Sequence, residues 1–260
     1  MRSESGRSDP ISEGKEFTAN VARGSRKDVR DAVVAARTAQ AKWWKTAPGT
    51  RGLVLYRLAE MMEARRAEFV DRTGDEDEVT AAIDRVVWYA GWCDKYAALL
   101  STRNPVGGPH FNFSTPEPTG VVGILAPDAP PLLGLVSVLM PALVAGNAVV
   151  LVASQSDPRT AIVFAEALAT SDIPAGVVNI ITGTRAELAP VLASHMDVNA
   201  IAFTDGDQTA ELQTAAAENV KRTRVLPARG ARDWFSPAAQ SLDDIAAYSE
   251  IKTIWHPAGI

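Results

Sequence analysis

The chain has 260 residues, of which 47% are apolar and 22% are charged, and its formal net charge is −5. This composition is typical of a globular protein with a sizeable core, and it excludes the collagen-like, disulfide-rich and disordered classes. The negative charge gives no reason to expect binding to nucleic acid or to an anionic membrane.

The N-terminal stretch and the cysteine content bear on location. Residues 1–16 are polar and rich in Ser, Gly and charge, without the apolar core of a signal peptide, which predicts a disordered tail. The longest apolar stretches contain Pro and Gly, so none is a convincing membrane span. Cys93 is the single cysteine, and an intrachain disulfide is therefore impossible. The expected location is a reducing cytoplasm.

Three helices are predicted to open the fold. Apolar residues recur at helical spacing over residues 29–45, 51–72 and 79–100. The next stretch, residues 104–118, differs, because aromatic residues alternate with polar ones between several prolines and glycines. This pattern is typical of a short exposed strand or arm.

From Gly120 onward the period of the apolar residues changes. Short apolar runs predict strands, which fall at 121–125, 148–152, 177–181, 200–203 and 223–226. Helical patterns lie between them, at 132–143, 158–169, 186–194 and 208–219. Apolar strands joined by crossover helices indicate an α/β fold with a parallel sheet covered on both faces. A loop over 227–237, a short helix over 242–248 and a strand over 250–255 are predicted to follow.

Several motifs in order carry a resemblance to a known family. They are GVVGI at 120–124 before Pro127, MPALVAGN at 140–147, IPAGVVN at 173–179 and IAFT at 201–204. This series resembles the cofactor-binding domain of the aldehyde dehydrogenase superfamily, and EIKTIW at 250–255 resembles the family's C-terminal strand. The chain is most similar to a truncated form without the catalytic domain, like the cysteine-less second module of two-module aldehyde dehydrogenases.

The resemblance implies a domain organisation. Residues 17–103 and 119–230 are expected to form a Rossmann-like, degenerate dinucleotide-binding domain. Residues 104–118 and 242–260 are expected to form an oligomerisation arm and C-terminal strand. In the family, the catalytic domain begins just after the strand corresponding to 223–226. Here the sequence runs almost directly to the terminal strand, which we interpret as deletion of the whole catalytic domain.

The resemblance also locates the catalytic groups that the chemistry requires, and we predict no catalytic residue. The nucleophilic cysteine should follow the Rossmann-like domain, but Cys93 precedes it on an apolar stretch and is interpreted as a structural thiol. The asparagine that stabilises the oxyanion corresponds to Ala129, next to Asp128. Loss of one such donor costs roughly 100- to 1000-fold in rate. The general base, a glutamate, corresponds to Leu226, give or take one residue.

The cofactor positions that the family implies are also altered. The lysine and glutamate that hold the adenosine ribose correspond to Val152 and Gln155. A glycine and a serine at the helix N-terminus that faces the pyrophosphate correspond to Asp205 and Gly206, followed by Asp207. A nearby carboxylate would oppose a phosphate by about 2–3 kcal/mol at ~6 Å and an effective dielectric of roughly 20. No cofactor is expected, and NAD or NADP would bind only if the degenerate site still functions. The vestigial cofactor-binding positions are Pro127, Ser154, Thr204 and Gly206.

The two aspartates have two interpretations. They fit N-terminal helix caps in an inactive site, and the alternative is a metal-bridged or altered ligand site. The three histidines, His110, His195 and His256, are scattered without the spacing of metal ligands, so no metal site is predicted.

The retained features suggest assembly. An unpaired strand at 250–255 favours association, and the candidate interface residues are Phe111, Phe113, Ile251, Thr253 and Trp255. The alternative is that this strand folds back on the chain's own arm. The leading hypothesis is an inactive structural or regulatory subunit of a full-length NAD-dependent aldehyde dehydrogenase, joined by strand addition. The other hypotheses are a nucleotide-binding or oxidoreductase-family protein with altered chemistry, and a self-associating homodimer.

Overall fold

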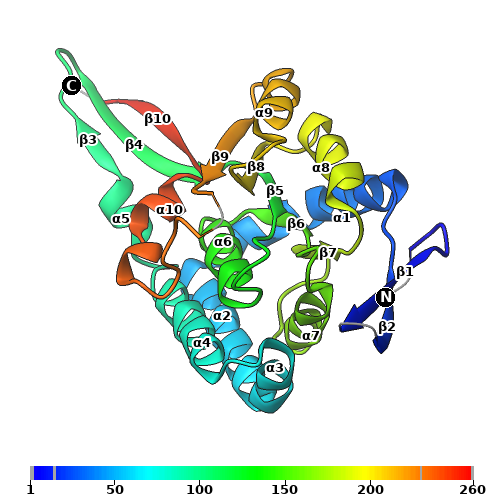
Figure 1. The fold of residues 1–260 in the computed structure, drawn as a ribbon. Helices are drawn as coiled ribbons and strands as arrows, with labels where there is room; N and C mark the ends of the chain where they lie inside the picture. Colours follow the sequence, from blue (N-terminus) through cyan, green and yellow to red (C-terminus); the bar gives the residue numbers. More distant parts are fainter. Residues whose placement is uncertain (1–2, 14–15, 229, 259–260) are drawn as a thin grey trace.

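The computed structural model describes residues 3–13, 16–228 and 230–258, and its centre is a parallel sheet (Figure 1). The five strands lie in the order β7-β6-β5-β8-β9. Their bounds are close to the predicted ones: β5 Val121–Leu125, β6 Ala148–Val152, β7 Val178–Ile181, β8 Ala200–Thr204 and β9 Arg222–Leu226. The chain runs outward from β5 to β7 and then returns to the other side of β5, as in a Rossmann-like fold. The predicted α/β class is confirmed.

Helices cover both faces of this sheet, so each face contributes to a separate core. Val121 and Leu125 of β5 pack with α1, α8 and α9, whereas Val122 and Ile124 pack with α6 and α7. The crossover helices are α6 Leu133–Val144, α7 Pro158–Ala169, α8 Arg185–Ser194 and α9 Thr209–Ala217. Burial on both faces explains why β5 and β6 are continuous apolar runs. In the described part of the chain, no helix is both long and apolar enough to cross a bilayer.

The helices before the sheet are more divided than predicted. Their bounds are α1 Arg26–Lys45, α2 Pro48–Ala64, α3 Arg66–Thr73, α4 Glu76–Ala90 and α5 Tyr96–Leu100. The single helix predicted over 51–72 was wrong, because Arg65 leaves the helical conformation at φ −108°, ψ 16°. The helix predicted over 79–100 is interrupted by a turn, in which the Trp92 N–H donates to the carbonyl of Tyr89. Apolar residues continue through both breaks, so their periodicity did not reveal them.

The N-terminus contains a hairpin where a disordered tail was predicted over residues 1–16. β1 Ser8–Glu13 pairs antiparallel with β2 Glu16–Ala22. The Ser3 hydroxyl also donates to the Asp28 carboxylate of α1 at 2.9 Å. The prediction was therefore wrong for the described part of this stretch, while residues 1–2 and 14–15 lie outside the described residues. Apolar residues alternate with polar ones along β2, which is typical of a strand, whereas the prediction rested on the polar composition of residues 1–16.

A three-stranded antiparallel sheet, which we call the arm, projects from the body of the molecule (Figure 1). It is built from β3 Thr102–Asn104, β4 His110–Pro118 and β10 Ser249–Pro257, in the order β10-β4-β3. The register of β10 and β4 runs from Ser249 opposite Pro118 to Pro257 opposite His110. Both predicted strands are present, and the terminal strand pairs with the chain's own arm, which was one of the two alternatives.

One buried asparagine fixes the root of the arm. Asn147, at the start of β6, is 0% exposed. Its Oδ1 accepts from the Gly120 N–H at 2.7 Å, where β4 passes into β5, and its Nδ2 donates to the Tyr248 carbonyl at 2.9 Å, where β10 begins. Both strands of the arm are thereby held to the central sheet by the same side chain.

The chain returns from the sheet to the arm through residues 227–248, which we call the closing segment. Near its start, the Ala231 N–H donates to the Ala228 carbonyl at 2.9 Å. The short elements η1 Pro237–Ala239 and α10 Leu242–Ala246 follow. Trp234, Ile245 and Tyr248 are buried in the core shared with α4 and α6. The closing segment is therefore a packed part of the fold.

Candidate functional site

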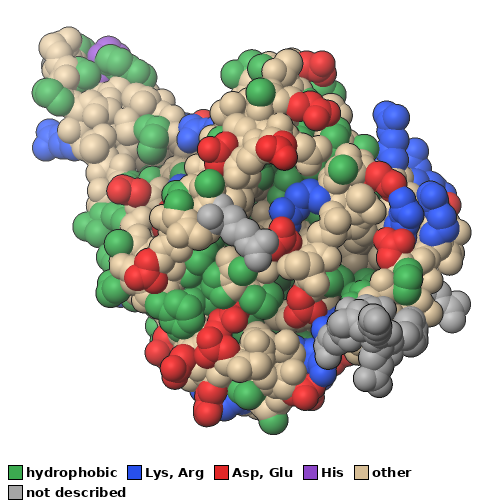
Figure 2. All heavy atoms as spheres, viewed as in Figure 1, with side chains coloured by type: hydrophobic (Ala, Val, Ile, Leu, Met, Phe, Trp, Pro, Cys, Tyr) green, Lys and Arg blue, Asp and Glu red, His purple; other side chains and the backbone are tan. Residues whose placement is uncertain are grey.

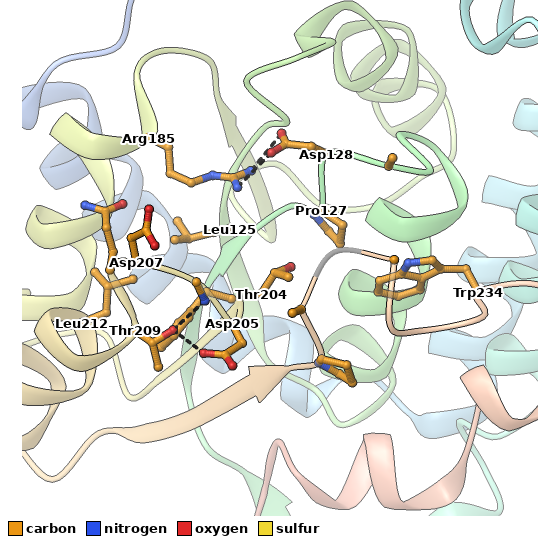
Figure 3. A pocket seen from close by; sticks show the side chains of 17 residues that line it. Leu125, Pro127, Asp128, Arg185, Thr204, Asp205, Asp207, Thr209, Leu212 and Trp234 are labelled. Carbon is orange, nitrogen blue, oxygen red and sulfur yellow. Dashed lines mark hydrogen bonds and ion pairs between the residues drawn. The ribbon is translucent and has the colours of Figure 1, made fainter.

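A cavity of about 320 Å³ lies at the carboxyl edge of the parallel sheet. It sits between the ends of β5 and β8, the switch point at which α/β folds of this topology bind ligands. Its walls come from the loop after β5, the start of α9 and the closing segment, with Asp128 and Trp234 on different sides (Figure 3). Figure 2 shows this face hollowed near its centre, with acidic and basic side chains beside the hollow.

The Asp128 carboxylate is the most heavily bonded group at the cavity. It accepts from the Arg185 guanidinium through two N–O contacts of 3.2 Å, from the Ser154 hydroxyl at 2.9 Å and from the Gln155 N–H at 3.0 Å. Arg185 also donates to the Ala126 carbonyl at 2.6 Å. These bonds join the loops after β5 and β6 to the first residue of α8. The charges of Asp128 and Arg185 therefore neutralise each other.

The start of α9 presents carboxylates to the cavity. Asp205 and Asp207 line it, and both are exposed. Asp205 accepts from the Thr209 hydroxyl at 2.7 Å, and that hydroxyl oxygen accepts from the Gly206 N–H at 2.9 Å. One amide of the turn before the helix is therefore already occupied by a side chain. Beside it, the buried hydroxyl of Thr204 has no hydrogen-bond partner in the described structure.

The positions to which the resemblance assigns the oxyanion donor and, within one residue, the general base hold side chains that cannot fill those roles. Ala129 lines the cavity where an oxyanion-binding amide is expected. Leu226 ends β9 with 3% exposure and packs in the core. Cys93 lies between α4 and α5, is 1% exposed and is not among the cavity's lining residues. Burial raises the pKa of its thiol to about 12, so almost none of it is the nucleophilic thiolate at neutral pH.

Strand order and the cavity at the switch point define a Rossmann-like fold of the dinucleotide-binding class. The model of the aldehyde dehydrogenase family matches residues 7–227. The chain therefore belongs to the aldehyde dehydrogenase family.

Its relatives are much longer proteins. The chain is 34% identical over 209 residues to the putative aldehyde dehydrogenase DhaS of Bacillus subtilis (strain 168), a match that covers 75% of this chain and 41% of DhaS. It is 35% identical over 219 residues to the mitochondrial aldehyde dehydrogenase of Sus scrofa, covering 78% and 41% respectively. The chain spans less than half the length of these relatives.

Solved structures likewise match most of this chain but less than half of their own chains. HpcC from Thermus thermophilus matches with a TM-score of 0.81 and 29% identity, covering 86% of this chain and 46% of HpcC. PnpE in complex with nicotinamide adenine dinucleotide matches with a TM-score of 0.82 and 27% identity, covering 86% and 48%. The fold of the matched part is thus that of the aldehyde dehydrogenases.

The cofactor that this family implies does not fit the residues present. Val152, at the position of the ribose-binding lysine, is 0% exposed. The Gln155 Oε1, at the position of the ribose-binding glutamate, accepts from the Arg185 N–H at 2.9 Å. The exposed carboxylates of Asp205 and Asp207 would oppose a pyrophosphate by about 1–3 kcal/mol each, depending on solvent screening. The ribose contacts that the family implies are therefore absent from this arrangement, and the pyrophosphate end of the site carries two opposing charges.

The structure brings together most of the predicted cofactor positions. Pro127, Thr204 and Gly206 line the cavity, whereas Ser154 is 3% exposed and lies behind Asp128 as one of its donors. Arg185 was missed. Its position directly before the predicted helix at 186–194 was visible in the sequence, but nothing there indicated that it would turn toward Asp128. Within the described residues, no group of three or more His, Cys, Asp or Glu side chains is arranged to hold a metal ion.

Proposed function

We propose that this protein is a non-catalytic member of the aldehyde dehydrogenase family that serves as a structural or regulatory subunit of a full-length, NAD-dependent aldehyde dehydrogenase. The observation that carries the proposal is the direct passage from β9, through the closing segment, into the arm. A chain arranged in this way keeps the family's association strands, while Ala129 and Leu226 occupy two positions that catalysis would need. A cytoplasmic location is part of the proposal and rests on the single, buried Cys93.

The geometry of β10 supports association by strand addition. β10 is an edge strand, and the Thr119 N–H donates to the Tyr248 carbonyl while the Ala258 N–H donates to the Pro109 carbonyl. In an antiparallel ladder the bonded residues alternate, so these two bonds assign the even-numbered residues of β10 to β4. The backbone groups of Ile251, Thr253 and Trp255 therefore face the open edge. An edge with free donors and acceptors is a template for a further strand.

The side chains of the arm add apolar surface. Ile251 is 56% exposed and Trp255 is 60% exposed, on the face that also carries Thr253. Phe111 and Phe113 lie on the opposite face, with their ring centroids 5.4 Å apart. The five proposed interface residues are therefore divided between the two faces of the arm. A partner strand beside β10 would point its alternate side chains to the two faces of the arm. One set would lie on the face of Trp255, and the other set would lie on the face of Phe111 and Phe113.

Co-purification tests the proposal. The tagged full chain, expressed at its native level in its own cells, should capture a protein with NAD-linked aldehyde dehydrogenase activity. Thr253→Pro removes an N–H from the open edge without removing a backbone bond to β4, and it should abolish capture; the hydroxyl contact with Ser114 is lost equally in the Pro and Val variants. Thr253→Val is the matched control, because it keeps that N–H, and it should capture normally.

Two outcomes would contradict the proposal. One is recovery of the bare chain without dehydrogenase activity. The other is equal capture by the Pro and Val variants, which would exclude the β10 edge as the contact. Sedimentation of the pure protein separates the alternative of self-association, because a homodimer would form without any partner and would still be disrupted by Thr253→Pro.

A further inference from the structure

A second cavity, of about 510 Å³, lies along the outer edge of β9 and is strongly basic. It is bounded by β9 and by the closing segment, near the point where β10 begins (Figure 1). Three arginines line it, Arg222, Arg224 and Arg232, and none of its described lining residues is acidic. It is separate from the cavity between β5 and β8, which is lined by aspartates.

Among the described residues, the positive charge around this cavity is only partly balanced by carboxylates. Arg224 and Arg232 both pair with a single buried carboxylate, that of Asp244. Behind them, Arg85 is 4% exposed and makes its hydrogen bonds to neutral oxygens, with its Nη1 donating to the Ala239 carbonyl at 2.9 Å. The Arg232 Nη2 donates to that same oxygen at 3.0 Å. Two guanidinium groups thus converge on one neutral acceptor, an arrangement that favours a nearby anion.

Arg222 completes the basic rim in a different way. Its guanidinium pairs with the exposed Glu250 carboxylate of β10, at an N–O distance of 2.7 Å. That pair is half-exposed and is local to the outer end of the cavity. The excess charge therefore lies deeper, at Arg224, Arg232 and Arg85.

Unused hydrogen-bond donors lie beside this charge. Tyr248 lines the cavity, is 1% exposed, and its buried hydroxyl has no partner in the described structure. The outer edge of β9 is also open. The Arg222 N–H donates to Asn199 and the Leu226 carbonyl accepts from Asp205, so the alternate residues Thr223 and Val225 turn their backbone N–H groups away from β8.

We propose that this cavity binds a small oxyanion of the phosphate or carboxylate class, held by Arg224, Arg232 and the Tyr248 hydroxyl. The forked guanidinium groups match the paired oxygens of such anions. The bound anion supplies the negative charge that Asp244 alone does not, and it gives the Tyr248 hydroxyl an acceptor. The site depends on the closing segment, because Arg232 and Tyr248 belong to it and Arg224 faces it.

Phosphate and succinate are the probes, titrated separately into the full chain at pH 8 and compared with chloride at matched ionic strength. Either probe should raise the melting temperature in a saturable manner and give calorimetric binding. Arg232→Gln should weaken binding about 10- to 100-fold, the usual effect of losing a charge-assisted hydrogen bond. Arg103→Gln, on β3 of the arm, should leave binding unchanged.

Tyr248→Phe is a second variant, and it should fold normally because the deleted hydroxyl makes no bond within the described protein. Its melting temperature without probe should match or slightly exceed that of the parent chain, while its affinity for the probe falls several-fold. Failure of both probes to act beyond chloride would overturn the proposal. So would an unchanged affinity in both the Tyr248→Phe and the Arg232→Gln variants.

Discussion

The Asn147 side-chain amide lies 2.9 Å from the Tyr248 carbonyl oxygen and joins the central sheet to the first residue before β10. Because the same side chain accepts from Gly120, its removal leaves the Gly120 N–H without a partner and leaves the Tyr248 carbonyl with the Thr119 N–H as its remaining donor. We expect Asn147→Ala to lower the free energy of unfolding by about 2–4 kcal/mol. Urea denaturation measures this loss, and hydrogen exchange should show faster exchange at the Thr119 amide.

Ser114→Ala is the matched control for the arm. It removes a hydroxyl contact of 2.9 Å to Thr253 within the arm but leaves the root intact. Its cost should be smaller, about 1 kcal/mol or less, because Thr253 is exposed to water and the Asn104 amide, which also donates to Ser114, keeps Asn112 as an acceptor. Equal exchange at Thr119 in both variants would show that Asn147 does not fix the root.

Asp128 should contribute more to stability than its partner Arg185. Asp128→Ala removes the shared acceptor of Ser154, Gln155 and Arg185, and we expect a loss of about 2–4 kcal/mol. Arg185→Met leaves Asp128 with its other two donors, in a partly exposed site, and should cost about 1–2 kcal/mol. Chemical denaturation ranks the two variants, and the reverse order would contradict this account of the loop network.

Neutralising the aspartates at the start of α9 should improve any residual dinucleotide binding. In the parent chain, calorimetry with NAD or NADP should give no binding heat up to millimolar ligand. The double variant Asp205→Asn, Asp207→Asn keeps the acceptor for Thr209 but removes two negative charges. Any affinity it shows should exceed that of the parent by roughly 10- to 100-fold at low ionic strength. Micromolar binding by the parent chain would contradict the misfit described for this cavity.

Stability should fall in alkali because three buried groups resist ionisation. Burial raises the pKa of Cys93 from its ordinary value of 9.0 to about 12, and raises the pKa of Tyr89 and Tyr248 from 10.0 to about 12. Below pH 9 both folded and unfolded states hold these groups neutral, so their contribution is fully present. Between the unfolded and folded values mainly the unfolded state ionises, which favours unfolding by about 2–4 kcal/mol per group near pH 12.

Two measurements check this pH dependence. Urea midpoints should decline between pH 9 and 12, and tyrosinate absorbance should show Tyr89 and Tyr248 ionising together with unfolding. Cys93 should react with a thiol reagent far more slowly in the folded protein than in urea. Rapid, stoichiometric labelling of the native protein at pH 8 would show that the thiol is not buried in this way.

Arg85 should anchor the closing segment. It donates to the Ser137 hydroxyl and to the carbonyls of Trp234 and Ala239, at 2.6, 2.8 and 2.9 Å. Arg85→Met removes the donor of Ser137 and Trp234, while the Ala239 carbonyl keeps Arg232 as its donor. We expect a loss of about 2–4 kcal/mol with proteolytic cleavage shifted into the closing segment. Arg57→Met, at an exposed arginine of α2, is the control and should change neither property.

The sequence predicted the central sheet well because burial on both faces leaves a strong mark. In β5 and β6 every residue is buried, and the apolar runs end where the strands end. The breaks between the N-terminal helices had no comparable pattern in the sequence. The residue at the break between α2 and α3 is Arg65, which is an ordinary helix former, and apolar residues at helical spacing continue on both sides of it.

The candidate site was predictable in position but not in its bonding. Ala129, Asp205 and Gly206 lie where the resemblance placed them, because the ends of β5 and β8 must be adjacent in this topology. The pairing of Asp128 with Arg185 depends on side chains from two distant loops. No local pattern encodes such a contact. The N-terminal hairpin was missed for another reason, because the prediction rested on the polar composition of residues 1–16, and the alternating apolar residues of β2 lie beyond that stretch.

The stretch between Ala228 and Ala231 is a position at which the chain could accept an inserted polypeptide. Both residues are exposed, and one hydrogen bond joins them, so two ends of an inserted polypeptide would emerge close together there. A chimaera built by grafting a foreign domain at this position would leave the ladder of β9 with β8 and the ladder of β10 with β4 in place.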